Sequence, residues 1–411
     1  MRTQPVQVDA MTAPHFSPTP AAPNIIHLPR CQWAGHRLLM NITSDEYYHL
    51  QLEGSHSAFL VRFIRKTMPQ GAAASPLPNA QPDALYNPWL ENACAWGIVK
   101  DGVLLAAIET CPETWNNRLR ITEMWVHEAH RGHGFGHSLM DVAKEQLRHE
   151  RHRALVLETQ SNNVGAIDFY MSQGFMLIGF DACAYTNNDI ERREVRMEMG
   201  WFPDKKAPLT EDSLVIRPIR PDERHDIEAL TRRAFWNKFK MGCDEHYLVH
   251  TLWHDPAYLP NLSRVAEMNG EVIGCILYTR ARLETPDGPR EVLTFGPLCT
   301  DPNHQGRGVG EALIKHTARL AKAAHWPGIV ILGEKDYYPR VGFRLCSDYG
   351  ITTSDGKNFD AFMCLELIPG SLTPGRFFEA PVYTSIDKDA VDAFDQRFPP
   401  MRKLYFPGQW A

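Results

Sequence analysis

The sequence predicts an α/β protein made of two tandem copies of one domain, in which a mixed, mostly antiparallel sheet is flanked by helices. Two glycine-rich segments of similar form, 130–137 and 305–310, each follow a strand-like run and precede a helix-like run. The residues around them repeat the same order of short strands and amphipathic helices. Such self-similarity indicates two structural units, and 411 residues are enough for two or three domains.

The composition is that of an ordinary globular protein, with 44% apolar and 22% charged residues. A formal charge of -6 gives no general attraction to nucleic acid or to an anionic membrane, so we expect neither as a partner. No apolar stretch has the length of a transmembrane helix, and the start of the chain lacks the apolar core of a secretory signal. Nine scattered cysteines favour a reducing compartment, and we expect a cytoplasmic protein.

One spacing could suit a metal, at Cys243, His246 and His250. One thiol and two imidazoles leave a tetrahedral site without a clear fourth ligand. We therefore expect no metal here and interpret these three residues as part of a helix surface.

Shifts in composition divide the chain into five parts. The first residues are rich in Pro, Thr, Ala and Gln, which is typical of a disordered tail. A polar segment with two prolines separates the two repeated patterns, as a linker would. The expected parts are a tail at 1–29, a first domain at 30–202, a linker at 203–210, a second domain at 211–370 and a C-terminal extension at 371–411 that packs on the second domain.

In the first domain, Thr43–Glu46 resembles a capping sequence for a following helix, and Asp101-Gly102 suits a type I′ hairpin. The segment 71–88 is expected to be a loop over the site entrance. Strands are expected at 37–42, 94–100, 103–109, 120–126, 154–158, 175–180 and 193–201, and helices at 57–65, 138–147 and 166–171.

In the second domain, Pro221-Asp-Glu begins a helix, and Asn269-Gly270 marks a hairpin. Strands are expected at 213–218, 264–268, 272–278, 292–298 and 328–332, and helices at 221–235, 246–252 and 311–323.

Each glycine-rich segment has the chemistry of a phosphate cradle. Glycine permits positive φ and lets a ligand approach the backbone closely. The free N–H groups of a first helical turn and the positive end of the helix dipole favour a phosphate. The expected binding residues are Arg131, Gly132, His133, Gly134, Phe135 and Gly136 in the first domain and Gln305, Gly306, Arg307, Gly308, Val309 and Gly310 in the second.

The two segments resemble the acyl-CoA signature of the GNAT N-acetyltransferase superfamily, Arg/Gln-x-x-Gly-x-Gly/Ala. A second shared motif, Tyr-x-x-x-Gly-Phe, follows at Tyr170–Phe175 and again at Tyr338–Phe343. With 130–134 and 157–163 added, the first domain is similar to streptothricin acetyltransferases. The second is similar to predicted N-acetyltransferases of unassigned substrate, through 234–238, 242–246, 293–297 and 337–343.

This resemblance implies a sheet whose fourth and fifth strands splay apart to admit the pantetheine arm of acetyl-CoA, the expected co-substrate. It implies that backbone groups at the strand ends, Val126 and Leu298, help to bind the thioester. Asn163 resembles the family asparagine that hydrogen-bonds the pantetheine chain.

The same resemblance supplies candidates for proton transfer. Tyr170 and Tyr338 match the general acid that protonates the leaving thiolate, although a tyrosine in this place can also be a core residue. Glu123 is either the general base or a solvent-facing carboxylate that balances a cationic substrate. The second domain has no clear base; Asp244, Glu245 and His246 offer one only if they are more than a solvated helix face.

The leading hypothesis is an acetyl-CoA-dependent N-acetyltransferase acting on a primary amine of a small molecule, either a streptothricin-like antibiotic or a polyamine. In one alternative, only one domain is catalytic and the other is a structural or regulatory acyl-CoA binder. In another, both domains sense acyl-CoA without turnover. A homodimer is possible. A Rossmann protein is rejected, because each glycine-rich segment follows the fourth strand-like run rather than the first.

Overall fold

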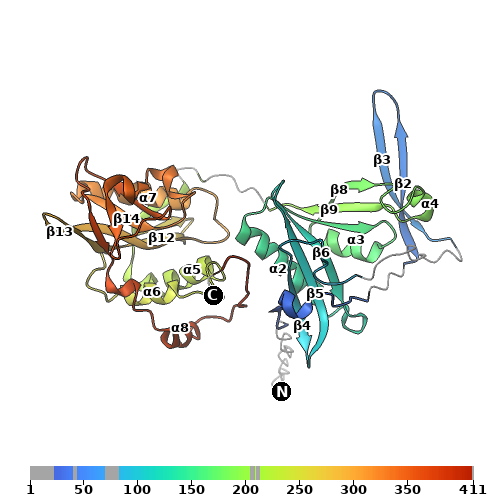
Figure 1. The fold of residues 1–411 in the computed structure, drawn as a ribbon, viewed down its shortest axis with the longest axis horizontal. Helices are drawn as coiled ribbons and strands as arrows, with labels where there is room; N and C mark the ends of the chain where they lie inside the picture. Colours follow the sequence, from blue (N-terminus) through green and yellow to red (C-terminus); the bar gives the residue numbers. More distant parts are fainter. Residues whose placement is uncertain (1–22, 40–43, 70–82, 204–208, 210–212, 410–411) are drawn as a thin grey trace, which may run out of the picture. The chain divides into compact units, whose positions relative to one another are not determined.

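The computed structural model describes residues 23–39, 44–69, 83–203, 209 and 213–409. The chain forms two compact units, 1–202 and 203–411, and each contains its own sheet (Figure 1). Most of the expected linker at 203–210 lies outside the described residues. In the described part of the chain, no helix has both the length and the apolar character needed to cross a membrane.

The first unit is a seven-stranded sheet in the order β1-β4-β5-β6-β7-β9-β8. Helix α2 (Phe135–Glu150) buries Leu139, Val142 and Leu147, and its apolar stripe packs against the central strands. The strands are β1 Ile26–His27, β4 Cys94–Lys100, β5 Val103–Glu113, β6 Arg118–Val126, β7 Ala154–Gln160, β8 Met176–Asp181 and β9 Arg196–Trp201. The other helices are α1 Arg30–Trp33, α3 Val164–Ser172 and α4 Asp189–Arg192.

The central strands β6 and β7 run parallel but stay paired only at their beginnings. Their register runs from Arg118 opposite Ala154 to Ile121 opposite Leu157 and then stops. The last residues of β6, 122–126, therefore have no ladder partner on the β7 side among the described residues. The implied splay is present in the first unit, and it opens at the end of β6 that leads to the cradle.

The beginning of the first unit differs from the sequence expectation in two ways. Residues 1–22 lie outside the described residues, but Ile25 and Leu28 are buried, and β1 pairs with β4. The expected tail at 1–29 is therefore too long. Of the strand expected at 37–42, the structure describes 37–39, where Arg37 forms only an isolated bridge to Ala84.

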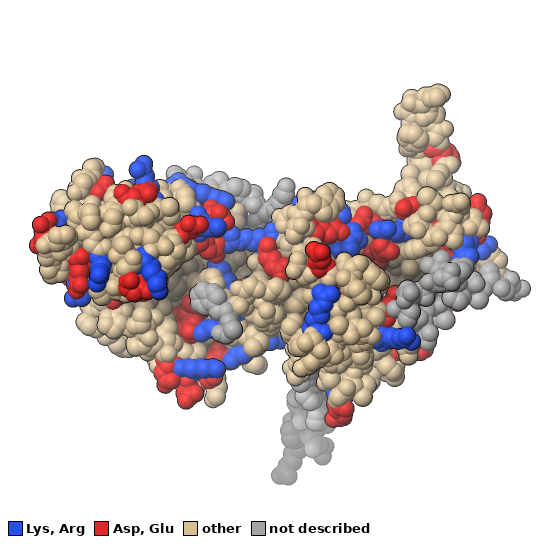
Figure 2. Space-filling view, viewed as in Figure 1, with Lys and Arg blue, Asp and Glu red and all other residues tan. Residues whose placement is uncertain are grey.

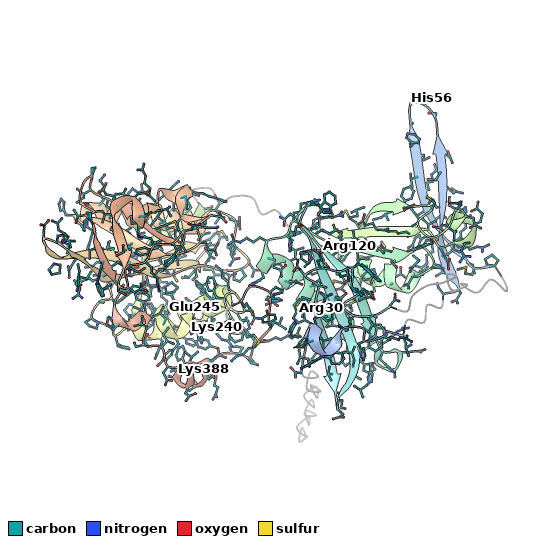
Figure 3. The ribbon with its side chains drawn as sticks, viewed as in Figure 1. Arg30, His56, Arg120, Lys240, Glu245 and Lys388 are labelled. Carbon is teal, nitrogen blue, oxygen red and sulfur yellow. The ribbon has the colours of Figure 1, made fainter. Side chains whose placement is uncertain are left out.

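The helix expected at 57–65 is wrong, because this segment is a β-strand. β2 (Glu46–Gly54) and β3 (Phe59–Thr67) pair residue by residue in a separate two-stranded sheet. Nor does Ser44 cap a helix: its hydroxyl accepts a hydrogen bond from the N–H of Glu46, at the start of β2. A short apolar run fits helical and strand periods alike, and cross-strand pairing decided between them. The hairpin projects from its unit with His56 near its tip (Figure 3).

The second unit has a sheet in the order β10-β11-β12-β13-β14-β17-β15, with β18 paired to β12 and β16. β13 and β14 pair at one position, Leu293 opposite Ile329, so this sheet splays as well. The strands are β10 Val215–Pro218, β11 Arg264–Met268, β12 Glu271–Thr285, β13 Gly288–Thr300, β14 Gly328–Leu332, β15 Arg344–Leu345, β16 Ile351–Thr353, β17 Phe362–Glu366 and β18 Gly375–Phe378. The helices are α5 Arg224–Phe235, α6 Glu245–Leu252, α7 Val309–Ala323 and α8 Lys388–Asp395.

Both turn dipeptides have the backbone that their sequence predicts. φ is 51° and 79° at Asp101 and Gly102, and 52° and 84° at Asn269 and Gly270. Positive φ at both central residues is what a type I′ hairpin requires, so the hairpins β4–β5 and β11–β12 follow from local sequence alone.

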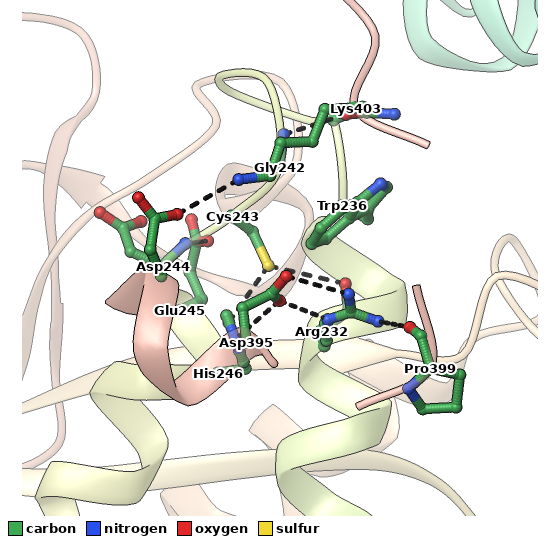
Figure 4. Close-up of polar contacts among 12 residues, drawn as sticks. Arg232, Trp236, Gly242, Cys243, Asp244, Glu245, His246, Asp395, Pro399 and Lys403 are labelled. Atoms are coloured by element: carbon green, nitrogen blue, oxygen red, sulfur yellow. Dashed lines mark hydrogen bonds and ion pairs between the residues drawn. The ribbon is translucent and has the colours of Figure 1, made fainter. Parts of the chain in front are cut away.

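The residues after 370 are integral to the second unit. β18 pairs with β12 through Arg282 opposite Phe378. Farther along, α8 is tied to α5 by Asp395, whose carboxylate binds the Arg232 guanidinium at 2.6 Å (Figure 4). The extension therefore contributes both a strand and a helix to this unit.

Candidate acetyl-transfer sites

The first cradle is a glycine-rich turn at the N-terminus of α2. Gly132 and Gly134 have φ of 79° and 80°, and a Cβ built on either would meet no heavy atom within 4 Å. The N–H groups of Gly134, Phe135, Gly136 and His137 begin the helix and donate to no backbone carbonyl in the described residues. Open space beside the two glycines and free amides at the start of the helix suit a diphosphate.

Two side chains of this turn point back onto the chain. The Arg131 Nε lies 3.4 Å from the carbonyl oxygen of Val126, and the His133 ring lies 3.0 Å from the carbonyl of Arg131. The Phe135 ring stacks on His130 with centroids 6.0 Å apart. These contacts fix the turn, while its N–H groups remain available.

The second cradle repeats this geometry at the start of α7. Gly306 and Gly308 have φ of 75° and 89°, again with no atom within 4 Å of a built Cβ. Gln305 donates to the carbonyl of Thr300 at 3.3 Å, and Arg307 lies 3.2 Å from the His304 ring. Val309 is buried and begins the helix. Both expected cradles thus have the same backbone form.

The third glycine of each cradle, Gly136 or Gly310, packs against an aromatic side chain, which is a different residue type in each unit. A Cβ on Gly136 would meet the Phe169 ring at 3.2 Å, whereas a Cβ on Gly310 would meet the Tyr337 hydroxyl at 2.6 Å. Each of these aromatic residues directly precedes a candidate acid, Tyr170 or Tyr338. The aromatic pair therefore has the same arrangement relative to the cradle in both units.

The strand ends that face the splay are Val126 and Thr300. The N–H of His127 donates to Leu105 at 2.8 Å, and the N–H of Asp301 donates to Ile273 at 2.9 Å, so these two positions correspond. Because successive N–H groups alternate in direction, the N–H of Val126 points toward β7 and that of Thr300 toward β14.

Leu298, the residue expected at this place from the sequence, lies two positions earlier. Its side chain lies 3.9 Å from a Cβ built on Gly310, just as Met124 lies 3.5 Å from one on Gly136. Leu298 therefore corresponds to Met124. Thr300 lies five positions before Gln305, just as Val126 lies five positions before Arg131, so the spacing to the cradle is a sequence signal that identifies Thr300.

Glu123 lies in the part of β6 that has no partner on the β7 side, and it is half-buried. Burial raises the pKa of this carboxyl to about 9, and the neighbouring Asp83 and Glu109 add to the rise. Glu109 is fully buried, accepts a hydrogen bond from Thr122 at 2.7 Å and is bound by the N–H of Tyr86. A carboxylate with a raised pKa is the better proton acceptor for a protonated amine.

Tyr170 is 8% exposed, and its hydroxyl has no hydrogen bond to any residue that the structure describes. Burial raises the pKa of this phenol above its usual value, and the charge of Glu123 contributes to the rise. Phe169 and Met124, the chain neighbours of Tyr170 and Glu123, both lie against Gly136, so the structure brings together the segments that carry the candidate acid and the candidate base. Residues of the expected entrance loop 71–88 also reach this site. Asp83 contributes to the raised pKa of Glu123, and Leu85 and Tyr86 are buried. Residues 70–82 lie outside the description.

Asn163 is the N-cap of α3, where its side-chain oxygen accepts from the N–H of Ala166 at 3.4 Å. The preceding Asn162 is 3% exposed, and its side-chain oxygen has no partner among the described residues. Asn163 therefore caps the helix that carries Tyr170, and the buried side-chain oxygen of the adjacent Asn162 has no partner among the described residues.

In the second unit, Tyr338 lies in a 3-10 turn and packs on Phe295 of β13, with ring centroids 6.0 Å apart. Burial raises its pKa above the usual value. The backbone of Gly333 comes so close that a Cβ there would overlap the Tyr338 ring. At the place of Glu123 this strand has Pro297, which follows Gly296 in a cis peptide bond.

The interpretation of Cys243 and His246 as helix-surface residues is wrong. Cys243 is 7% exposed and His246 is fully buried, with the Cys243 sulfur 3.4 Å from His246 Nδ1 (Figure 4). His246 Nε2 lies 3.3 Å from Asp395, and burial lowers its pKa to about 4. These residues join α6 to the extension.

The other residues near this helix face take no part in either cradle. His250 is partly exposed and lies 2.9 Å from the Glu228 carboxylate. Asp244 pairs with Lys240, and burial raises the pKa of Glu245 to about 7. Nothing in the described residues links these groups to Tyr338. The solvated helix face expected here is half-buried instead, because α8 covers it.

Family models match both units. The model described as "Acetyltransferase (GNAT) family" matches residues 64–175, and the one described as "Acetyltransferase (GNAT) domain" matches residues 257–345. Neither match includes the extension.

Curated relatives match part of the chain. A streptothricin acetyltransferase of Escherichia coli is 35% identical over 112 residues, which cover 27% of this chain and 64% of the relative. The uncharacterized N-acetyltransferase YjhQ of E. coli K12 is 34% identical over 122 residues, which cover 30% and 65%. The matched region thus spans slightly less than two thirds of either relative.

Solved structures with similarity include E. coli YhbS in complex with CoA, at 22% identity and a TM-score of 0.38, covering 46% of this chain and 98% of that one. Another is nourseothricin acetyltransferase, at 22% identity and a TM-score of 0.33, covering 43% and 95%. The two family matches, one in each unit, together with the repeated cradle and the two splayed sheets, show that each unit of the chain contains a GNAT acetyltransferase domain.

Proposed function

We propose that this protein is an acetyl-CoA-dependent N-acetyltransferase and that the first unit transfers the acetyl group to a primary amine of a small molecule. The observation that carries the proposal is the position of Glu123 and Tyr170 beside the open end of β6, next to a cradle of free amides. The first unit's resemblance to streptothricin acetyltransferases points to a streptothricin-like or polyamine acceptor.

The residues fit acetyl-CoA as a co-substrate. The amides of Gly134–His137 would bind the diphosphate. The absence of side chains at Gly132 and Gly134, with no heavy atom within 4 Å of a built Cβ, leaves room for it. The backbone N–H of Val126 would polarise the thioester carbonyl, and the unpaired oxygen of Asn162 is an acceptor for an amide of the pantetheine chain. Acetyl-CoA supplies the activated acyl group.

The two titratable side chains divide the proton transfers. Glu123 accepts a proton from the incoming ammonium, because its pKa of about 9 lies close to that of an alkyl amine. Tyr170 donates its hydroxyl proton to the departing thiolate. Its hydroxyl has no hydrogen bond to a described residue, so that proton is not committed elsewhere.

The acidic surroundings also select the acceptor. Asp83 and Glu109 both contribute to the raised pKa of Glu123, and the negative field of these carboxylates, where they are ionised, raises the local concentration of a cationic amine. A neutral acyl acceptor such as an alcohol would not gain from this field. The proposal therefore predicts higher kcat/KM for amines with more than one positive charge.

The test is thiol release from acetyl-CoA with streptothricin, spermidine and a peptide with a free N-terminus, followed by mass spectrometry of the products. Tyr170→Phe should lower kcat by about 10²–10⁴-fold, while calorimetry gives unchanged CoA affinity. Tyr185→Phe is the matched control, because this tyrosine of the same unit hydrogen-bonds Gln160 at 3.3 Å and has no place in the proposed chemistry.

Two results would contradict the proposal. If wild-type protein binds CoA but acetylates none of the amines, the acyl-CoA sensor becomes the better hypothesis. If Tyr338→Phe abolishes turnover and Tyr170→Phe does not, the activity belongs to the second unit and the first is a structural or regulatory CoA binder.

A further inference from the structure

The second unit lacks a carboxylate at the strand position of Glu123, whereas its C-terminal extension carries one, Glu379. β18 pairs with β12 up to Arg282 opposite Phe378, and Glu379 is the next residue. The chain then turns through a short 3-10 helix, Pro381–Tyr383, that lies against the sheet. The strand pairing therefore fixes where both Glu379 and Tyr383 leave the backbone.

Tyr383 contacts β13 in the part of this strand that splays from β14. Its hydroxyl donates to the carbonyl oxygen of Gly296 at 3.3 Å and accepts from the Thr279 hydroxyl at 3.3 Å. A Cβ on Gly296 would meet the Tyr383 ring at 3.1 Å. Gly296 lies beyond Leu293, the single residue at which β13 pairs with β14. The extension thus reaches the open part of the strand, next to Pro297.

The two tyrosines lie on either side of this short stretch. Tyr338 packs on the Phe295 ring, within the cluster that contains α7, whereas Tyr383 packs with the α5 and α6 cluster. Between them the strand carries Gly296 and no titratable side chain. Any proton acceptor for this site must therefore come from another element.

Glu379 has the properties expected of that acceptor. It is half-buried, and its carboxylate has no ion pair or hydrogen bond with any residue that the structure describes. Glu379 directly follows Phe378, the last residue paired with β12, and precedes Tyr383 by four residues. Burial raises the pKa of Glu379 above the usual value, and the charge of Glu379 contributes to the raised pKa of Tyr383. Its neighbours Ala380 and Val382 are buried in the α5 and α6 cluster, which fixes the position of the segment. An unpaired, half-buried carboxylate is uncommon as a purely structural feature.

We propose that the C-terminal extension completes the acceptor site of the second unit, with Glu379 as the carboxylate that receives the protonated amine and Tyr383 as the positioning residue between Glu379 and β13. The inference rests on the acetyl-transfer function proposed above, but not on which unit acts on streptothricin-like amines.

The proton transfers balance as follows. Glu379 takes one proton from the ammonium, and the neutral amine nitrogen forms a C–N bond with the thioester carbon. The C–S bond breaks, and the thiolate receives the hydroxyl proton of Tyr338. The nitrogen loses a second proton, which restores the Tyr338 hydroxyl, and Glu379 releases its proton to water. The products are an amide, CoA thiol and one proton.

The experiment isolates the second unit within the full chain. In a Glu123→Gln/Tyr170→Phe background, residual thiol release is measured with spermidine, streptothricin and a peptide with a free N-terminus. Glu379→Gln should then lower kcat/KM by about 100-fold or more and leave CoA affinity by calorimetry within about twofold. Glu379→Asp, which keeps the charge, should recover part of the loss.

Two further variants separate a chemical role from a structural one. Glu284→Gln removes an exposed carboxylate from the same strand pair, where it binds Arg282 at 2.7 Å, and should leave turnover unchanged. Tyr383→Phe should raise KM more than it lowers kcat, because the strand contact that positions Glu379 is weakened. Melting curves monitored by circular dichroism verify that each variant folds.

Three outcomes would overturn the inference: no residual turnover with any of the three amines in the background variant, equal turnover with and without Glu379→Gln, or faster turnover after Glu379→Gln. The last would mean that the extension restrains the site instead of completing it. If wild type acetylates amines through the first unit while the background variant is inactive, the proposed function stands and only this inference fails.

Discussion

Glu123 on β6 lies directly opposite Glu109 on β5, in the same cross-strand pair. Like charges in such a pair repel, and here the buried Glu109 contributes to the raised pKa of Glu123. The first unit thus carries a feature that costs stability at the place where the proposed chemistry needs a strong base. Such local costs are common at functional sites.

This pair predicts a pH profile. With a pKa of about 9, Glu123 is mostly protonated at pH 7, so kcat/KM of the first unit should be about one hundredth of its alkaline plateau and rise toward pH 9. Glu109→Gln removes a neighbouring negative charge and should move this rise to lower pH. The profile is measured with the best amine of the panel. A profile that is flat between pH 6 and 9 would contradict the role of Glu123.

Stability gives a second test of the same group. Glu123 has a higher pKa in the folded protein than in the unfolded chain, where it is 4.5, so folding above pH 4.5 takes up a proton. The free-energy cost of this proton uptake grows as the pH rises toward about 9. Glu123→Gln should therefore stabilise the first unit at pH 7 by about 1–2 kcal/mol, after allowance for partial exposure.

This corresponds to a Tm increase of about 2–8 °C for a unit of this size, with no increase at pH 4.5. Calorimetric melts at the two pH values measure it. The same variant should lose activity, so gain of stability with loss of turnover is the expected combination. An equal effect at both pH values would show that the pKa is not raised.

The third glycine of the second cradle should tolerate substitution by alanine less well than the third glycine of the first cradle. Gly310→Ala places a methyl group 2.6 Å from the Tyr337 hydroxyl and should displace this ring, whereas Gly136→Ala meets the edge of Phe169 at 3.2 Å and needs only a small shift. CoA affinity at the second cradle should therefore fall by 10-fold or more, on the order of 1.4 kcal/mol, with a smaller change at the first.

Calorimetry on full-length protein, with one cradle altered at a time, gives the two affinities. Gly179→Ala serves as a control in β8, because the φ of Gly179 is not positive and a Cβ there would meet no atom closer than 3.6 Å. Equal losses at the two cradles would contradict the packing argument.

The ion pair between Arg232 and Asp395, which attaches the extension to α5, predicts how much stability the second unit loses when the pair is broken. Arg232 is almost fully buried and binds Asp395 through two of its nitrogens, at 2.6 and 3.2 Å. Asp395→Asn leaves this guanidinium without its counter-charge and should destabilise the second unit by about 3–5 kcal/mol.

The same helix offers a matched control. Asp392 binds Lys403 at 3.3 Å with both side chains about half exposed, so Asp392→Asn should cost less than 1 kcal/mol. Urea unfolding of both variants gives the comparison. Similar losses for the two substitutions would mean that Asp395 does not anchor the extension.

The projecting hairpin presents an uncharged tip. Residues 54–61 contain no Lys, Arg, Asp or Glu, and the tip appears tan in Figure 2. Phe59 is 88% exposed. Phe59→Ser should therefore change unfolding free energy by less than about 0.5 kcal/mol, as denaturant titration would measure. A larger loss would show that the tip is packed in solution.

The sequence alone determined the repeated architecture of this protein. The glycine spacing at 131–136 and 305–310, the helical periodicity that follows, and the turn dipeptides at 101–102 and 269–270 all act within a few residues, so local patterns predict them well. The cradles have the predicted backbone because positive φ at Gly134 and Gly308 is a local property of glycine.

Tertiary structure decided what depends on distant partners. The segment at 59–67 is a strand because β2 pairs with it. His246 is buried because α8, about 140 residues later, packs over it. Burial, strand register and the approach of Tyr383 to β13 are long-range outcomes, which no short stretch of sequence encodes.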